Sequence, residues 1–301
     1  AGAADAFPFD RPGSMPVVTV CIPHWQVEVY AKPCLRSLRK FAPSADPSVE
    51  LEVMVVDNGS RDGSLDYLRS LSWIKLIERP EETSDNWPTN VFTAWDLAAR
   101  EGTGEYLLTM HCDVFVRRDG WLDPHLRTIN QPTADGAPPI AASGAWKLEL
   151  SSPLYQSWKQ VTGTAVGRVK TALGRPGRNY SGRKYPRDYC ALYRREALLE
   201  HDCSFVPEGH LGGGLAVTQR LWAAGLDTAT FPVAEMARSV VHVTHGTAAV
   251  TPDKPLRHAR KQRQVERAVQ KLFRAKWVRD LVEDDALDGS ATAADAVRTA
   301  A

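Results

Sequence analysis

The 301-residue sequence has almost no net charge, no long apolar run and few cysteines. Its 37 Lys and Arg nearly balance its 36 Asp and Glu, and the resulting charge of +1 argues against a nucleic-acid partner. No apolar run approaches the roughly 18 residues that a membrane-spanning helix needs. Residues 1–16 lack the basic and then apolar stretches of a signal peptide, so we expect a cytoplasmic protein. The five cysteines are odd in number and show no CxxC spacing, which predicts reduced, mostly buried thiols.

Short apolar runs alternate with helical patterns through the first half of the chain. The runs cover residues 17–22, 51–56, 74–77 and 106–110, and the helical patterns cover 35–41, 61–71 and 91–99. This alternation indicates βαβ units and a mainly parallel sheet flanked by helices. Ligands of such sheets bind beyond the carboxyl ends of the strands. Asp57 and Asp113 follow two of the runs at that edge, which predicts a polar ligand site there.

The second half of the chain is less regular. We expect strands at 189–193 and 240–243, and a helix at 215–224 that ends at Gly225. The basic stretch 163–187 is either a lid that closes over an anionic ligand or a solvated loop. The expected organisation is a flexible arm (1–15), one domain (16–250, with halves 16–125 and 126–250), a basic amphipathic helix (251–285) and a disordered tail (286–301).

Ten Lys and Arg lie between residues 254 and 279, among apolar residues at helical spacing. The apolar stripe of this helix either packs on the domain or makes a peripheral membrane contact over residues 254–281.

Four segments together resemble the nucleotide-binding half of the family 2 glycosyltransferases, which have the GT-A fold. They read PVVTVCIP, CLRSL, VMVVDNGSRDGS and GEYLLTMHCDVFV, and the likeness covers about residues 16–125 and more loosely extends to 246. The resemblance implies a Rossmann-like α/β fold and an inverting transfer of a sugar from a nucleotide-diphosphate sugar to a hydroxyl acceptor. A UDP-sugar is the expected donor, with TDP- and GDP-sugars as alternatives, and a divalent cation, Mn²⁺ or Mg²⁺, is the expected cofactor.

The expected donor-binding residues follow three of the strands. They are Pro23, His24, Asp57, Asn58, Gly59, Ser60, His111 and Asp113. Asp57 can accept hydrogen bonds from a base or a ribose, and its alternative role is to cap its own turn. The family's metal-binding Asp-x-Asp motif reads His111-Cys112-Asp113 here, so only Asp113 matches as a metal ligand; its alternative role is a strand-end charge.

Two histidines near the end of the domain complete the expected metal site. The family often places a metal or phosphate ligand in this region. We predict His245, in the Thr-His-Gly turn, as the ligand, and His242, inside the apolar run, as a core histidine.

The catalytic base has no clear position in the sequence. An inverting transfer needs a carboxylate that takes the proton of the acceptor hydroxyl. The acidic pair that often serves in the family aligns with Gly213 and Gly214. Glu208 and Asp85 are the candidates that remain. Their alternative roles are a solvated loop residue and part of a helix cap.

Two rival functions fit parts of the sequence. One is a sugar nucleotidyltransferase, although the first strand runs into Pro23-His24-Trp25-Gln26 rather than the glycine-rich loop of that class. The other is a protein that binds nucleotide sugars without catalysis, which the residues His111, Gly213 and Gly214 would explain.

Overall fold

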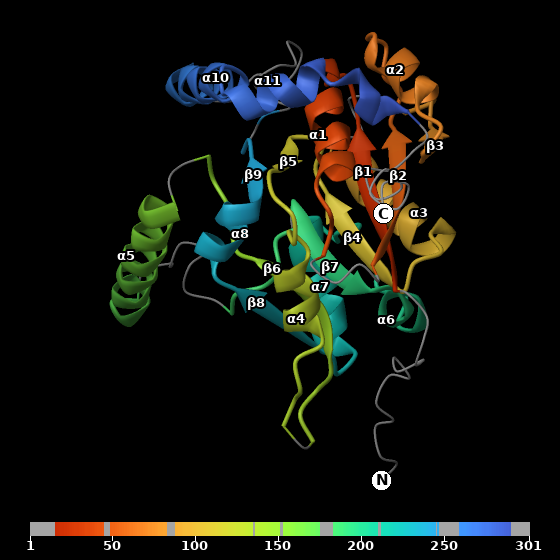
Figure 1. Ribbon diagram of the computed structural model, residues 1–301. Helices are drawn as coiled ribbons and strands as arrows, with labels where there is room; N and C mark the ends of the chain where they lie inside the picture. Colours follow the sequence, from red (N-terminus) through yellow and green to blue (C-terminus); the bar gives the residue numbers. More distant parts are fainter. Residues whose placement is uncertain are drawn as a thin grey trace, which may run out of the picture.

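A seven-stranded sheet with the strand order β3-β2-β1-β4-β7-β6-β8 forms the centre of the protein (Figure 1). The computed structural model describes residues 16–44, 49–82, 88–134, 136–150, 153–174, 183–209, 212–244, 246 and 259–289. The predicted arm, 1–15, lies outside these residues. Within these ranges, none of the helices combines the length and the apolar character that crossing a membrane requires.

The first half alternates strands and helices. Its elements are β1 (Val17–His24), α1 (Glu28–Lys40), β2 (Glu50–Asp57), α2 (Ser64–Ser70), β3 (Ile74–Glu78), α3 (Thr89–Glu101) and β4 (Tyr106–Met110). Strands β3, β2, β1 and β4 are parallel neighbours. The predicted βαβ units and the mainly parallel sheet are therefore confirmed.

The second half contains more elements than the sequence indicated. They are β5 (Val114–Val116), α4 (Asp123–Ile129), β6 (Ile140–Ala145), α5 (Pro153–Ala172), β7 (Cys190–Arg194), α6 (Arg195–Glu200), α7 (Gly213–Ala223), β8 (Asp227–Phe231), α8 (Val233–Ser239) and β9 (Val240–His242). Among the described strands of the large sheet, only β7 runs antiparallel to its neighbours, and β5 and β9 form a separate antiparallel pair. Gly225 follows α7 with a φ of +80°, as its predicted role at the helix end requires.

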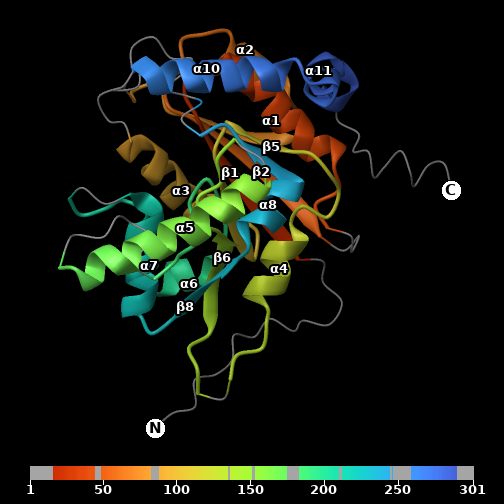
Figure 2. The same cartoon turned by 90° about the vertical axis from the view of Figure 1, so that its left-hand side faces the viewer.

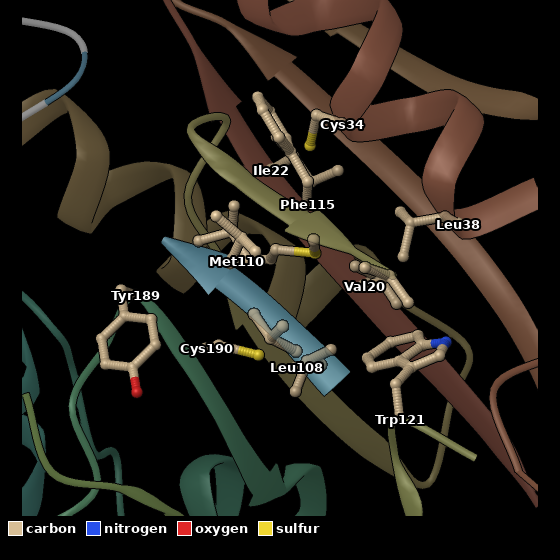
Figure 3. Close-up of a cluster of buried hydrophobic side chains, with 14 of the residues drawn as sticks. Val20, Ile22, Cys34, Leu38, Leu108, Met110, Phe115, Trp121, Tyr189 and Cys190 are labelled. Atoms are coloured by element: carbon tan, nitrogen blue, oxygen red, sulfur yellow. The ribbon is translucent and has the colours of Figure 1, made fainter. Parts of the chain in front are cut away.

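The sheet is covered on both faces, which explains the continuous apolar character of its strands. On β1, Val20 and Ile22 point towards α1, whereas Cys21 belongs to the opposite layer with Trp95 of α3. Figure 3 shows the α1 side, where Leu38 packs over the strands. All five cysteines are buried, which confirms that part of the cysteine prediction.

The chain changes face between β3 and β4. Helices α1 and α2 pack on one face of the sheet and α3 on the other, while β1 lies between β2 and β4. A crevice opens beyond the strand ends at such a switch point, because the neighbouring crossovers lead away on opposite faces. The topology therefore places the ligand site beside the ends of β1 and β4.

The predicted C-terminal helix consists of two helices, α10 (Ala259–Phe273) and α11 (Lys276–Glu283), which run over α1 (Figures 1 and 2). Their apolar residues Val265, Leu272 and Val278 are buried in the core, so the packing alternative for this segment is confirmed. The 3₁₀ helix η2 (Asp285–Asp288) follows. The predicted start of a disordered tail at 286 therefore falls inside an ordered turn.

The buried Arg36 of α1 holds η2 in place. Its guanidinium binds the carboxylates of Asp285 and Asp288 and the carbonyl oxygens of Leu281 and Val282. Burial opposes the ionisation of Asp288, but hydrogen bonds from Arg36 and Tyr67 lower the pKa of that carboxyl below its ordinary value. The ion pairs explain why this short segment folds back onto α1.

The solvated-loop alternative for 163–187 is wrong for its first residues, because α5 continues to Ala172. Gly163 and Gly167 suggested flexibility, yet each costs a helix only about 1 kcal/mol relative to Ala. Residues 175–182 lie outside the described residues.

Candidate active site

A cleft of about 210 Å³ lies at the switch point of the sheet. It is lined by residues at the ends of β1, β2 and β4, by the start of α3 and by the turn before β7: Pro23, His24, Trp25, Asn58, Pro88, Val91, Phe92, His111, Cys112 and Asp188. Four of the predicted donor-binding residues, Pro23, His24, Asn58 and His111, therefore share one cleft. The start of α3 contributes apolar side chains to the lining, whereas the polar side chains come from the strand ends and the turn before β7.

His24 and Asn58 are fixed by neighbours outside the cleft. The His24 Nε2 lies 2.7 Å from the hydroxyl oxygen of Ser64. Burial lowers the pKa of His24, although the nearby Asp57 carboxylate opposes the shift, so the ring is neutral near pH 7. The backbone N–H of Asn58 donates to the His24 carbonyl oxygen at 2.9 Å, which ties the ends of β1 and β2 together.

Asp57 is buried, with 1% of its area exposed, and it precedes the cleft-lining residue Asn58 in the chain. Its Oδ2 accepts a hydrogen bond from the N–H of Ser60 at 2.9 Å, so it does cap its own turn. Its Oδ1 is buried and has no hydrogen-bond partner among the described residues. A buried carboxylate oxygen without a hydrogen-bond partner lowers the stability of the fold, and a donor group of a ligand would remove that penalty.

The turn after β2 is held rigidly. Gly59 has a φ of +75°, and a Cβ there would lie 2.5 Å from the carbonyl oxygen of Glu82, so no other residue fits without strain. Arg79 donates from Nη1 to the Asn58 Oδ1 at 3.0 Å and to the Thr93 hydroxyl at 2.9 Å. These contacts fix the orientation of the Asn58 amide.

Three side chains beside the cleft could hold a metal ion. They are His111, Asp113 and His242, whose donor atoms all lie within 4.8 Å of one another. The Asp113 Oδ1 lies 3.8 Å from the His111 Nδ1 and 3.6 Å from the His242 Nε2. His111 also lines the cleft, so a cation held by this cluster would face a ligand there.

The two histidines are oriented for this role by contacts on their other sides. The His242 Nδ1 lies 3.0 Å from the carbonyl oxygen of Leu148, which assigns the proton to Nδ1 and leaves the Nε2 lone pair facing Asp113. The His242 ring stacks on the Tyr189 ring with 4.5 Å between the ring centroids, and the His111 ring stacks on the Trp95 ring with 5.7 Å between the centroids. A backbone carbonyl that accepts the second ring N–H, as at His242, is typical of histidines that bind metals.

The second carboxylate oxygen of Asp113 is held by the backbone. Its Oδ2 accepts a hydrogen bond from the N–H of Gly246 at 3.0 Å, and the Gly246 carbonyl oxygen accepts one from the Tyr30 hydroxyl at 3.2 Å. A Cβ at 246 would lie 2.8 Å from the same Oδ2, so a residue other than glycine would displace the carboxylate. Asp113 therefore presents a fixed Oδ1 towards the two imidazoles.

His242 was predicted to be a core histidine, and the structure instead places it in the cluster. It is buried, as predicted, but it pairs with Val114 across the β5–β9 ladder and so lies beside Asp113. The predicted ligand His245 lies outside the described residues. The sequence could not reveal the pairing of β9 with β5, since the two strands are far apart in the chain.

Of the two predicted catalytic bases, Glu208 is described by the structure and does not line the cleft. Glu208 has 95% of its side chain exposed, and its Oε1 lies 3.6 Å from the Nη2 of Arg220. Its alternative role, a solvated loop residue, matches this position. Asp85 lies outside the described residues.

Asp188 is the carboxylate that does line the cleft. Its Oδ2 accepts a hydrogen bond from the N–H of Gly214 at 3.0 Å. A Cβ at Gly214 would approach the Asp188 side chain to 3.1 Å, and a Cβ at Gly213 would lie 2.4 Å from the Phe92 ring. Asp188 and Phe92 therefore fill the space that an acidic pair at 213 and 214 would need.

Sequence reasoning missed Asp188 because it precedes a strand. The amino end of an antiparallel strand lies at the same sheet edge as the carboxyl ends of its parallel neighbours. If the direction of β7 had been known, an aspartate immediately before this strand would have indicated a residue at the ligand-binding edge of the sheet.

Comparison with known proteins matches residues 19–201 to the sequence profile of a family described as Glycosyl transferase family 2. A search of curated protein sequences returned no match.

Among solved structures, the mannosyltransferase PcManGT from Pyrobaculum calidifontis, in complex with GDP-Man and Mn²⁺, is similar with a TM-score of 0.51. It shares 19% sequence identity, and the match covers 96% of this chain and 80% of that one. S. aureus TarS 1–349 matches with a TM-score of 0.45 and 14% identity, over 89% of this chain and 74% of that one. Glucosyl-3-phosphoglycerate synthase from Mycobacterium tuberculosis, with UDP, matches with a TM-score of 0.39 and 15% identity, over 71% and 70%. The first of these supports the predicted GT-A fold.

Proposed function

Because this chain belongs to glycosyl transferase family 2, it is a glycosyltransferase that uses a nucleotide sugar, and we propose that it is a metal-dependent, inverting enzyme. The donor is a nucleotide-diphosphate sugar, with UDP-sugars first among the candidates, and the acceptor is a hydroxyl group. One observation carries the proposal: the cluster of His111, Asp113 and His242 shares a wall with the cleft at the ends of β1, β2 and β4.

The donor set of the cluster favours Mn²⁺ over Mg²⁺. Mg²⁺ demands oxygen ligands, whereas two imidazole nitrogens and one carboxylate suit a softer divalent cation. His111, Asp113 and His242 would hold the ion, and the diphosphate oxygens would complete its coordination. When bound, the cation supplies positive charge that stabilises the departing nucleoside diphosphate.

Buried polar atoms of two residues that are chain neighbours of the cleft lining support a nucleotide pocket. The Asp57 Oδ1 and both side-chain atoms of the Asn90 amide lack hydrogen-bond partners among the described residues. Together with the fixed amide of Asn58, they offer a donor and acceptors for a base and a ribose. The aromatic side chains of Trp25 and Phe92 offer faces for stacking.

Asp188 acts as the catalytic base in this proposal. The acceptor oxygen forms a bond to the anomeric carbon while the bond from that carbon to the diphosphate oxygen breaks. The electron pair of the broken bond leaves with the nucleoside diphosphate, and the acceptor proton passes to the Asp188 carboxylate. The hydrogen bond from Gly214 at the start of α7 holds the carboxylate in the cleft.

A thermal-shift screen tests the donor and the metal. UDP-, TDP- and GDP-sugars are each added with Mn²⁺, with Mg²⁺ and without a cation. GDP-sugars belong in the panel because the similar mannosyltransferase was solved with GDP-Man and Mn²⁺. We expect stabilisation that depends on Mn²⁺, by ligand linkage, and we expect Asp113→Asn to abolish it. A shift that survives in Asp113→Asn would refute the metal site.

Transfer kinetics test the base with a matched pair of variants. Asp188→Asn should lower kcat by about 10² to 10⁴, the usual contribution of a general base, while leaving the affinity for the donor unchanged. Glu208→Gln is the control, and it should transfer at the wild-type rate. The opposite ranking of these two variants would assign the base to Glu208.

A further inference from the structure

Helix α5 exposes an apolar face. Leu154, Val161 and Trp158 have 85%, 70% and 61% of their areas exposed, and the same face continues through Val166, Val169 and Leu173. Tyr155 and Trp158 lie side by side on it, with ring centroids 5.8 Å apart. An exposed apolar patch of this extent on a soluble surface marks a site of interaction.

The side of α5 that faces the protein has the opposite character. Gln156 and Gly167 are buried there, and Gly163 is half-buried. The Gln156 side chain accepts a hydrogen bond from the N–H of Glu149 at 3.1 Å, and the helix packs against α8. Polar and small residues thus attach α5 to the domain, while its large apolar residues face outwards, the reverse of a surface helix that serves only the fold.

Helix α5 carries charge of one sign. Its twenty residues include three Lys and Arg and no Asp or Glu, although the two charge types are balanced in the whole chain. Figures 1 and 2 place α5 on the outer surface of the molecule, and in Figure 1 it lies on the far side of the molecule from α2 and α3.

We propose that α5 is a docking helix for an anionic lipid surface. Its exposed leucine, valine and aromatic side chains enter the boundary between headgroups and acyl chains, and the basic side chains of Arg168 and Lys170 on the same helix approach the phosphate groups. Tyrosine and tryptophan suit this depth because each combines an apolar ring with a polar atom.

A second copy of the chain fits this face less well. A symmetric pairing of α5 with itself would bring two positively charged helices together, since the same patch meets itself in such a dimer. An anionic membrane instead satisfies both the apolar face and the charge.

Vesicle co-sedimentation tests the proposal with the full chain. Vesicles of equal parts phosphatidylglycerol and phosphatidylcholine are compared with vesicles of phosphatidylcholine alone, at low and at high salt. The wild-type protein should sediment with the anionic vesicles, and added salt should weaken the binding. A triple variant, Leu154→Ser with Trp158→Ser and Val161→Ser, should bind at least about tenfold more weakly, a loss of about 1.4 kcal/mol or more.

Two further variants make the result specific to α5. Val166→Glu adds an acidic charge to the exposed face and should also weaken binding, without removing a large side chain. Arg263→Gln with Lys271→Gln removes two exposed charges from α10, and it should bind as the wild type does. The thermal shift caused by UDP-sugar and Mn²⁺ should be the same in the wild type and in all of these variants. A failure of the docking proposal can therefore be distinguished from a failure of the proposed function.

Three outcomes would overturn the proposal. The wild type could stay in the supernatant with anionic vesicles, or the triple variant and Val166→Glu could sediment as the wild type does. In the third outcome, light scattering would show a dimer that the triple variant dissociates, which would assign the face to a second copy.

Discussion

Substitution of Gly246 by Ala should weaken Mn²⁺ binding without removing any ligand atom. The N–H of Gly246 donates to the Asp113 Oδ2, and the residue packs directly against that carboxylate. The new Cβ would lie 2.8 Å from the Oδ2, 3.0 Å from the Asp113 Cβ and 3.0 Å from a methyl group of Val243. Ordinary van der Waals contact begins at 3.4 Å, so the carboxylate must retreat by several tenths of an ångström.

The size of the effect follows from the tolerance of metal coordination. Bonds between a metal and its ligands vary by only about 0.2 Å around their preferred lengths. Changes to groups that position a ligand typically cost a factor of about 10 to 100 in metal affinity. The expected loss for Gly246→Ala is therefore about 1.4 to 2.7 kcal/mol of binding free energy.

Electron paramagnetic resonance measures this loss, because free Mn²⁺ gives a strong signal that falls on binding. The titration is performed with UDP present, so that the nucleotide completes the site. Gly212→Ala is the matched control. It lies before α7 with a φ of −82°, and no described atom lies within 4 Å of the position that its Cβ would take. Urea denaturation of both variants confirms that each remains folded.

Either of two results would refute the reasoning. If Gly246→Ala binds Mn²⁺ as tightly as the wild type, the Asp113 carboxylate is not a ligand in this position. If Gly212→Ala loses as much affinity, the effect is general destabilisation and not displacement of a ligand.

Three other perturbations test separate parts of the structure. Arg36→Met should lower the free energy of unfolding by about 3 kcal/mol or more, measured in urea, because it leaves Asp288 and two carbonyl oxygens without their buried partner. Burial lowers the pKa of His125 from 6.5 to about 4, so the unfolded chain binds the extra proton. Stability should therefore fall by about 3 kcal/mol between pH 6.5 and pH 4, and His125→Gln should reduce that pH dependence. Gly214→Ala should push the Asp188 carboxylate and lower kcat about tenfold or more at unchanged donor affinity; an unchanged kcat would argue against Asp188 as the base.

The local elements of the first half could be predicted from the sequence. Strand β4 has the predicted bounds, and β1, β2 and β3 differ from prediction by a few residues at most. Each of these strands is a short run of apolar residues because both faces of the sheet are covered, so the pattern is strong. The motifs that follow them also identified the family, because the turn at Asp57 and the end of β4 carry the family's characteristic residues.

The second half was harder to predict for a physical reason. Its strands are short, β7 runs antiparallel, and α5 carries its apolar residues on the outer face. Periodicity indicates which residues share a face of a helix, but it cannot tell whether that face is covered by the protein or by something else.

The sequence by itself determined the fold class, the family and the position of Asp113, because these depend on residues that are neighbours in the chain. Only the tertiary structure decided that His242 joins Asp113, that Asp188 occupies the space above Gly214, and that α5 faces outwards. Gly214 and Asp188 are 26 residues apart in the chain, and His242 and Asp113 are 129 residues apart. Which distant segments meet is decided by strand pairing and strand direction, and neither leaves a local signal in the sequence.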